Sequence, residues 1–498
     1  MDHRQVPVSV GVSRRHIIAL GRASGIFGTL CLVQTLSGCF IDTEKPELQL
    51  DVPDRYRLAQ GSAEANRTGP PALDWWRGFH STELTALIEQ AQTSNFDIAV
   101  AIANVLQADA AVRTAQAALL PTVNLTGSGT RSLPSTGGVP QIGASNTAAR
   151  STYTNSLTQA SYVLDFWGVN RANLLQADEN SVAMRYQKEV VALTTISNVA
   201  NAYFQVLGSQ DRIRIARGNI AAASRILGLI RERLEVGTAS TLETSQQEAL
   251  LATQRASIPP LEITLQQNIA ALALLLGRAP EHFSVKGGSM NKIAVPRVTP
   301  GLPSEVLNRR PDIRSAEAAL KSQNHNVEGA RAAFFPSIAL TNSAGFSSLA
   351  LASLYTTPAF GYSSAASVTQ PLFDGGTRLG ALELAQGLQV AALQTYRKSV
   401  VSAFSDVDNA LVSLRQQTAR ERLQIAAVKS SREAFNISET RLREGTLDLV
   451  TLLNTQETLF ANEDTLAQVR LARLLAIVSL FQALGGGWPP QVNGDRPA

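Results

Sequence analysis

The sequence of 498 residues predicts a mainly helical membrane protein in which one unit of strands and long helices occurs twice. Three observations predict this fold class. An internal repeat has a constant offset, two proline-free stretches have helical periodicity, and two pairs of short alternating segments carry few charges.

Residues 1–38 are expected to be a lipoprotein signal peptide. Arg14 and Arg15 precede an apolar stretch of small residues, which ends in Leu36-Ser37-Gly38-Cys39. These four residues resemble a bacterial lipobox, so Cys39 is expected to be the lipidated N-terminus of the mature chain. An ordinary signal peptide, a buried leader helix with a chance cysteine and a twin-arginine signal are the alternatives.

The leader also explains the charge and cysteine content. Residues 1–38 hold four arginines and one aspartate, so most of the net charge of +4 leaves with them, and nothing indicates a nucleic-acid partner. Cys31 lies in the leader, which excludes a disulfide or cysteine metal site in the mature chain. No later apolar run reaches about 18 residues, so we expect no transmembrane helix. A closed barrel would be the only way across a bilayer.

The repeat has an offset of 208 residues. The matching pieces are Gly168 with Gly376, 197–202 with 405–410, Arg233-Leu234 and Gly237 with Arg441-Leu442 and Gly445, and Leu276-Gly277 with Leu484-Gly485. Upstream, 115–121 matches 330–336 at an offset of 215. The first copy therefore has seven extra residues, which we place as a loop within 131–150.

The repeat divides the chain. The first copy, 81–277, is expected to contain a helix, a strand pair near 121–165, a long helix near 169–235 and a return helix near 240–276. The second copy, 304–485, is expected to contain a helix, a strand pair near 336–373, a long helix near 377–444 and a return helix near 447–484. Residues 39–80 form a lipidated N-terminal segment, 278–303 a linker, both in an equatorial region, and 486–498 a C-terminal tail.

Apolar residues in steps of three, four and seven predict coiled-coil packing of the helices. They include Ile213, Ala216, Ile220, Ala223, Leu227 and Ile230 in the first copy and Val428, Phe435 and Leu442 in the second. A helix over 169–235 would be about 100 Å long, which no compact core can enclose. Gly237 and Gly445 are expected to end the long helices. Pro259-Pro260 predicts a kink in the first return helix only.

The strand segments alternate and carry few charges. Val123 and Leu125 share one parity, and so do Ile338 and Leu340. About 10 such residues span a bilayer as a tilted strand. Four strands cannot close a barrel, so several chains would have to contribute. Two soluble surface hairpins are the alternative.

Five motifs resemble the TolC-like outer-membrane factor family, in particular its NodT-type lipoproteins that serve RND efflux pumps. They are Asp74-Trp75-Trp76-Arg77 with Phe79, Asn95-Phe96-Asp97-Ile98, Leu164-Asp165-Phe166-Trp167-Gly168, Asn308-Arg309-Arg310-Pro311-Asp312-Ile313-Arg314 with Ala316-Glu317, and Ala483-Leu484-Gly485-Gly486-Gly487-Trp488. The resemblance implies a homotrimer with a 12-stranded outer-membrane barrel, continued by a long α-helical periplasmic barrel. It also implies a periplasmic adaptor and an inner-membrane RND transporter as partners.

The resemblance further implies a gate and a docking surface at the helix tips. The gate positions are Glu243, Asp448, Thr451 and Asn454, where family members commonly have aspartate in place of Asn454. A ring of Asn454 lacks three negative charges, which weakens the family argument for a cation-sensitive gate, although Asp448 and Glu243 could supply charge instead. The adaptor is expected to dock at Arg233, Leu234, Gly237, Arg441, Leu442 and Gly445. Plain helix capping is the alternative for both sets.

Nothing in the sequence indicates an enzyme, a cofactor or a metal site. The mature chain has three histidines, His80, His282 and His325, which are far apart and lie in no catalytic motif. The resemblance implies that the protein is an outer-membrane exit duct of a tripartite pump, for passive export of small toxic compounds. The alternatives are the duct of a type I protein secretion system and a periplasmic coiled-coil lipoprotein without a pore. The sequence does not identify the cargo.

Overall fold

The computed structural model describes residues 73–132, 150–296 and 303–486. These residues all belong to one compact unit, Pro46–Ala498. The expected signal peptide, Cys39, most of the N-terminal segment, the core of the first hairpin loop and nearly all of the C-terminal tail lie outside the described residues.

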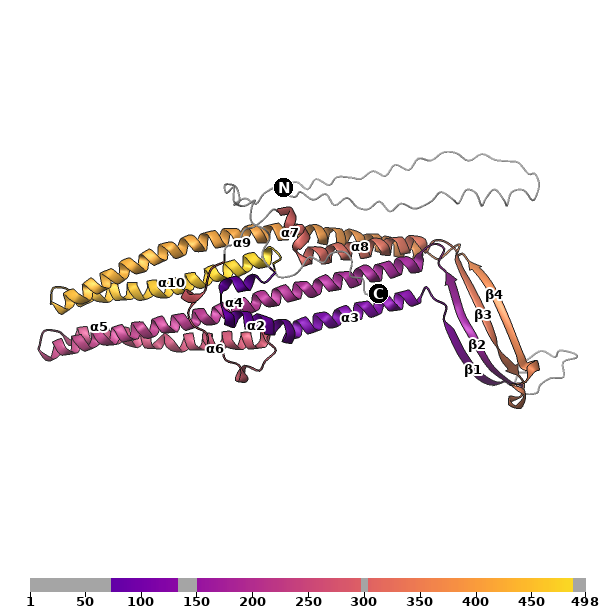
Figure 1. The fold of residues 1–498 in the computed structure, drawn as a ribbon, viewed down its shortest axis with the longest axis horizontal. Helices are drawn as coiled ribbons and strands as arrows, with labels where there is room; N and C mark the ends of the chain where they lie inside the picture. Colours follow the sequence, from indigo (N-terminus) through magenta and orange to yellow (C-terminus); the bar gives the residue numbers. More distant parts are fainter. Residues whose placement is uncertain (1–72, 133–149, 297–302, 487–498) are drawn as a thin grey trace, which may run out of the picture. The chain divides into compact units, whose positions relative to one another are not determined.

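The two copies contain matching helices (Figure 1). The first has α2 (Thr82–Ser94), α3 (Phe96–Ala117), α4 (Val169–Glu235), α5 (Thr241–Ala256) and α6 (Ile258–Leu275); the second has α7 (Pro303–Arg309), α8 (Pro311–Ala332), α9 (Thr377–Arg443) and α10 (Leu449–Ala483). The long helices α4 and α9 both have 67 residues, and each starts directly after a left-handed glycine, Gly168 or Gly376. Their ends therefore keep the offset of 208.

The return helix of the first copy is broken. α5 ends at Ala256, Ser257 separates the two pieces, and Pro259 and Pro260 lie in the first turn of α6. Proline has no N–H, so two carbonyls of the preceding turn lose their helical donors, and the predicted kink is confirmed. In the second copy α10 runs for 35 residues without interruption.

The four strands form one antiparallel sheet in the order β1-β2-β3-β4. They are β1 (Val123–Ser132), β2 (Arg150–Leu164), β3 (Ser337–Ser348) and β4 (Phe360–Thr369). Ile338 pairs with Leu164 on one side and with Val368 on the other. β4 ends four residues before the expected Phe373, because Pro371 cannot donate to a sheet ladder. β1 and β4 are the edge strands.

Apolar stripes hold the helices together. Around the middle of α4, Trp75, Phe79, Phe204 and Phe481 belong to one buried cluster, in which the rings of Trp75 and Phe481 stack with centroids 4.8 Å apart. A second cluster packs α7 and α8 on α9 and α10. A third lies toward the ends of α4 and α9 and includes Ile226, Ile230, Phe435, Leu442 and Leu452. The coiled-coil prediction is thus confirmed at most of its positions.

The helices are more apolar than the sequence expectation assumed, while the absence of a transmembrane helix stays a prediction. Three helical stretches are long and apolar enough to cross a membrane by length and composition alone: Thr82–Ala117, Val169–Glu235 and Leu449–Ala483. The sequence expectation required an unbroken apolar run, whereas these windows tolerate a few charges. In the second and third stretches, 61% and 50% of the window is buried inside the chain, so much of their apolar surface is used in helix packing.

Candidate functional site

The ends of the two long helices have the same backbone geometry. Gly237 and Gly445 adopt φ values of 77° and 76°, in the left-handed region. Thr238 N donates to Arg233 O at 2.8 Å, and Thr446 N donates to Arg441 O at 2.9 Å. These bonds satisfy carbonyls that the helix end would leave free. A side chain at either glycine would meet open space but would strain the backbone.

Arginines of the first copy tie the two tips together. Arg233 Nη1 donates to the carbonyl of Leu442 at 2.8 Å. Arg225 Nε and Nη2 each lie 3.3 Å from Glu439, which also accepts from Arg443 at 2.8 Å. Leu442 is buried, Leu234 is half-buried and Arg441 is exposed. The structure therefore joins two of the expected docking residues, Arg233 of the first copy and Leu442 of the second.

The expected gate residues lie at the starts of the return helices. Glu243 Oε2 accepts from Ser240 N at 2.6 Å, and Ser240 Oγ accepts from Glu243 N at 3.3 Å, which is a capping box at α5. Asp448 caps α10 by accepting from Thr451 N at 2.9 Å and Thr451 Oγ1 at 2.8 Å. The backbone bond from Thr451, followed by its side-chain bond, lowers the pKa of Asp448. Asn454 is exposed one turn further along α10.

A buried amide pair above the tips was not anticipated. Gln247 and Gln456 are fully buried, and Gln247 Nε2 donates to Gln456 Oε1 at 3.4 Å and to the carbonyl of Ala223 at 3.0 Å. The pair joins α5, α10 and α4. Its signal in the sequence is weak: Gln247 stands four residues before Leu251, as a polar residue on an apolar stripe.

One face of the sheet carries most of its apolar side chains, and the other carries rows of hydroxyl groups. Val123, Leu125, Tyr362 and Val368 are exposed apolar or aromatic side chains on matching parity. On the alternate positions, hydroxyls pair across the strands: Thr126 with Ser156 at 3.1 Å, Ser128 with Thr154 at 2.6 Å and Ser343 with Ser363 at 2.8 Å. This alternation is typical of strands with lipid on one side and water on the other.

Aromatic residues gather at both ends of the sheet. At the helix end, Trp167 stacks on Phe335 with centroids 4.7 Å apart and donates to the carbonyl of Pro336 at 2.7 Å. At the other end, Phe346 makes edge contacts with Tyr355 and Phe360 at 5.4 Å and 5.5 Å. Aromatic girdles at the two interfaces of a bilayer have this arrangement.

The structure gives Arg310, of the motif Asn308–Arg314, a defined position. Its guanidinium donates to both oxygens of Asp312 at 3.0 Å and 2.7 Å, to the carbonyl of Ala483 at 3.2 Å, and pairs with Asp406 at 3.0 Å. Burial alone would lower the pKa of Arg310, but the two carboxylates outweigh burial and raise it. Arg310 thereby joins the start of α8 to α9 and to the end of α10.

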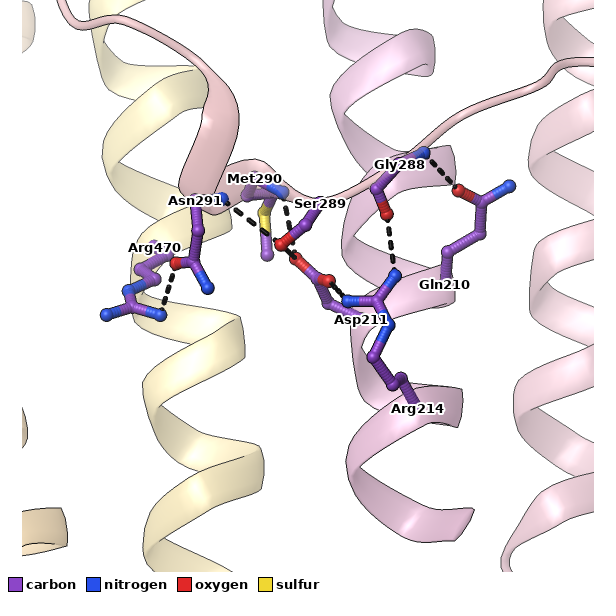
Figure 2. Close-up of polar contacts among 8 residues, drawn as sticks. All are labelled: Gln210, Asp211, Arg214, Gly288, Ser289, Met290, Asn291 and Arg470. Atoms are coloured by element: carbon purple, nitrogen blue, oxygen red, sulfur yellow. Dashed lines mark hydrogen bonds and ion pairs between the residues drawn. The ribbon is translucent and has the colours of Figure 1, made fainter. Parts of the chain in front are cut away.

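A loop between the copies crosses α4 and α10 (Figure 2). Asp211, which is buried on α4, accepts from Met290 N at 2.9 Å and Ser289 Oγ at 3.1 Å. On the other side, Asn291 Oδ1 accepts from Arg470 of α10 at 2.5 Å. The loop therefore fastens one helix of each copy. No cluster of three or more potential metal ligands occurs within the described ranges.

Comparison with known proteins agrees with this geometry. The family model described as outer membrane efflux protein matches residues 87–278 and, separately, 302–486. The chain is 35% identical to the pyoverdine export outer membrane protein OpmQ of Pseudomonas aeruginosa over 448 residues, which are 89% of this chain and 93% of OpmQ. It is 29% identical to the cation efflux system protein CusC of Escherichia coli over 465 residues, 92% of this chain and 98% of CusC.

A solved structure has the same fold. The open state of the Neisseria gonorrhoeae MtrE outer membrane channel superposes with a TM-score of 0.78 at 28% identity, covering 89% of this chain and 97% of MtrE. The family and these relatives are transport proteins of the outer membrane. The chain belongs to the outer membrane efflux protein family, the TolC-like outer-membrane factors.

Proposed function

We propose that three copies of this chain form the outer-membrane exit duct of a tripartite efflux pump, through which small toxic compounds leave passively. The observation that carries this proposal is the pair of open edges in one chain. The sheet ends in β1 on one side and β4 on the other, and β1 continues from α3 while β4 leads into α9.

The helical edges support head-to-tail closure. α3 exposes Phe96, Val100 and Leu106, with Leu106 65% exposed. α9 exposes Leu384, Val401 and Leu423, with Leu423 67% exposed. Apolar rows of this kind on both edges need partners. Pairing the α3–β1 edge of one chain with the α9–β4 edge of the next chain makes a closed ring. Three copies, the number that the family resemblance implies, would give 12 strands.

The ends of the ring would have separate tasks. Lipid on Cys39 and the amphipathic sheet would hold the duct in the outer membrane. Glu243, Asp448, Thr451 and Asn454 would narrow the periplasmic opening. The tips around Gly237 and Gly445 would receive the adaptor that links the duct to an RND transporter. Relatives named for pyoverdine export and cation efflux support efflux over protein secretion, but their cargoes differ.

Planar-bilayer recording tests this function. Purified protein is expected to migrate as a heat-resistant trimer and to give stepwise conductance of uniform size. A periplasmic coiled-coil lipoprotein without a pore would give neither result. Absence of both under conditions where the helices remain folded would overturn the duct.

A further inference from the structure

The break in the first return helix leaves a cavity of about 510 Å³ in the helical wall. Four helices line it, α4, α5, α6 and α10. Ala216 and Asn219 come from α4, Leu250 and Pro260 from α5 and α6, and Phe460 and Ala461 from α10. The cavity thus lies within one chain, where its first and second repeats meet. It is complete without a second chain.

The sequence explains why this junction is not filled. Pro259 and Pro260 interrupt the hydrogen-bond ladder, so the return helix stops at Ala256 and starts again at Ile258. On the facing helices, Ala216 and Ala461 present only methyl groups. A well-packed coiled coil would carry larger side chains at such positions.

The chemistry of the lining is that of a small-molecule site. Ile215, Leu250 and Phe460 supply apolar surface. Arg212 and Asp464 also line the cavity, but they neutralise each other through two bonds of 2.7 Å and 3.1 Å. The remaining charge in the lining is the carboxylate of Glu457, an exposed residue of α10. Mostly apolar clefts of about 300–1,000 Å³ with few polar groups are typical of sites for drug-sized molecules.

Asn219 is a buried polar residue of the lining whose side chain has no partner among the described residues. The side chain of Asn219 is only 6% exposed, and within the described part of the chain its amide makes no hydrogen bond. Buried amides are normally satisfied, because a lost bond to water must be replaced. The amide can offer a donor and an acceptor to whatever occupies the cavity.

We propose that this cavity binds a small amphipathic molecule whose aromatic body lies against Phe460 and Leu250 and whose single polar group hydrogen-bonds to Asn219. Such a site is separate from the gate and the tips. Its occupant would contact both pieces of the broken helix and α10 together.

Fluorescence titration with 1-aminoanthracene, an aromatic body with one amino group, tests the site. The full-length protein in nanodiscs is expected to enhance the fluorescence saturably, with one site per chain, after subtraction of empty nanodiscs. Asn219→Leu keeps the volume but removes the amide, and it should weaken binding about tenfold. Ala461→Phe fills the cavity mouth and should abolish saturable binding.

Ala249→Phe is the matched control, because Ala249 is exposed on α5 and does not line the cavity. It should bind like the wild type, and the thermal unfolding of all variants followed by circular dichroism should confirm that each is folded. No saturable enhancement in the wild type, or unchanged binding in Ala461→Phe, would overturn the site. Because binding is measured without current, its failure is distinguishable from failure of the duct.

Discussion

Single side chains at the start of the return helices have capping roles that depend on their charge. Asp448 is the clearest, since its carboxylate accepts two bonds from Thr451 at the first turn of α10. Its pKa is lowered in the folded chain. The stabilisation is therefore present above the ordinary pKa of aspartate and is lost as the pH falls through the lower folded value.

Asp448→Ala is accordingly expected to lower the melting temperature at pH 7, because the cap and its favourable charge at the helix start are lost. The difference from the wild type should shrink in strongly acidic buffer, where the carboxylate is protonated in both folded and unfolded chains. Thermal unfolding followed by circular dichroism at both pH values checks this. An equal loss at both pH values would exclude a charge-dependent cap.

Glu243 allows a test of the gate. Glu243→Lys reverses three charges in a trimer and should shift the conductance and the ion selectivity of single channels toward anions, because charge rings at a constriction set selectivity. Glu248→Lys is the control on the same helix, where Glu248 is exposed and paired with Arg231. Unchanged conductance and selectivity in Glu243→Lys would remove Glu243 from the gate.

At the scale of elements, the helical hairpins depend on their glycine turns. Gly445→Val places a β-branched side chain at φ 76°, which only glycine, asparagine and aspartate adopt readily. Export is expected to be lost while the trimer stays intact, because the distorted tip no longer fits the adaptor. Gly445→Asn tolerates this conformation and should retain most export. Efflux assays in cells, with trimer measured on gels, separate the two; full export in Gly445→Val would contradict docking at this tip.

The long helices and their turns are the elements that the sequence predicted best. Heptad spacing, the glycines and Pro259-Pro260 are local signals, and they located α4, α9 and the break in the return helix. The contacts of Arg310, Asp211 and Gln247 could not be anticipated, because each bonds to residues far away in the chain. Spacing gives the face on which a residue lies, but not which helix packs against that face.

At the scale of the whole molecule, the exposed apolar edges predict how assembly fails. Leu106→Glu puts a charge on α3 where the next chain of the trimer would pack. Burying an unpaired carboxylate there costs several kcal/mol. The trimer should be lost on native gels while the helical content is kept. Val236→Glu changes an equally exposed valine at a helix tip and should leave the trimer intact. A normal trimer in Leu106→Glu would place the interface elsewhere.

The unequal return helices give the proposed ring an uneven mechanical stiffness. A continuous helix such as α10 resists bending along its whole length, whereas the chain of α5 and α6 has a weak joint at residues 257–260. Under a sideways load at the tips, the first hairpin would flex at one point and the second would yield gradually. In a ring of three chains, three flexible first hairpins would then alternate with three rigid second hairpins. A force from a partner at the periplasmic end would therefore move alternate positions around the opening.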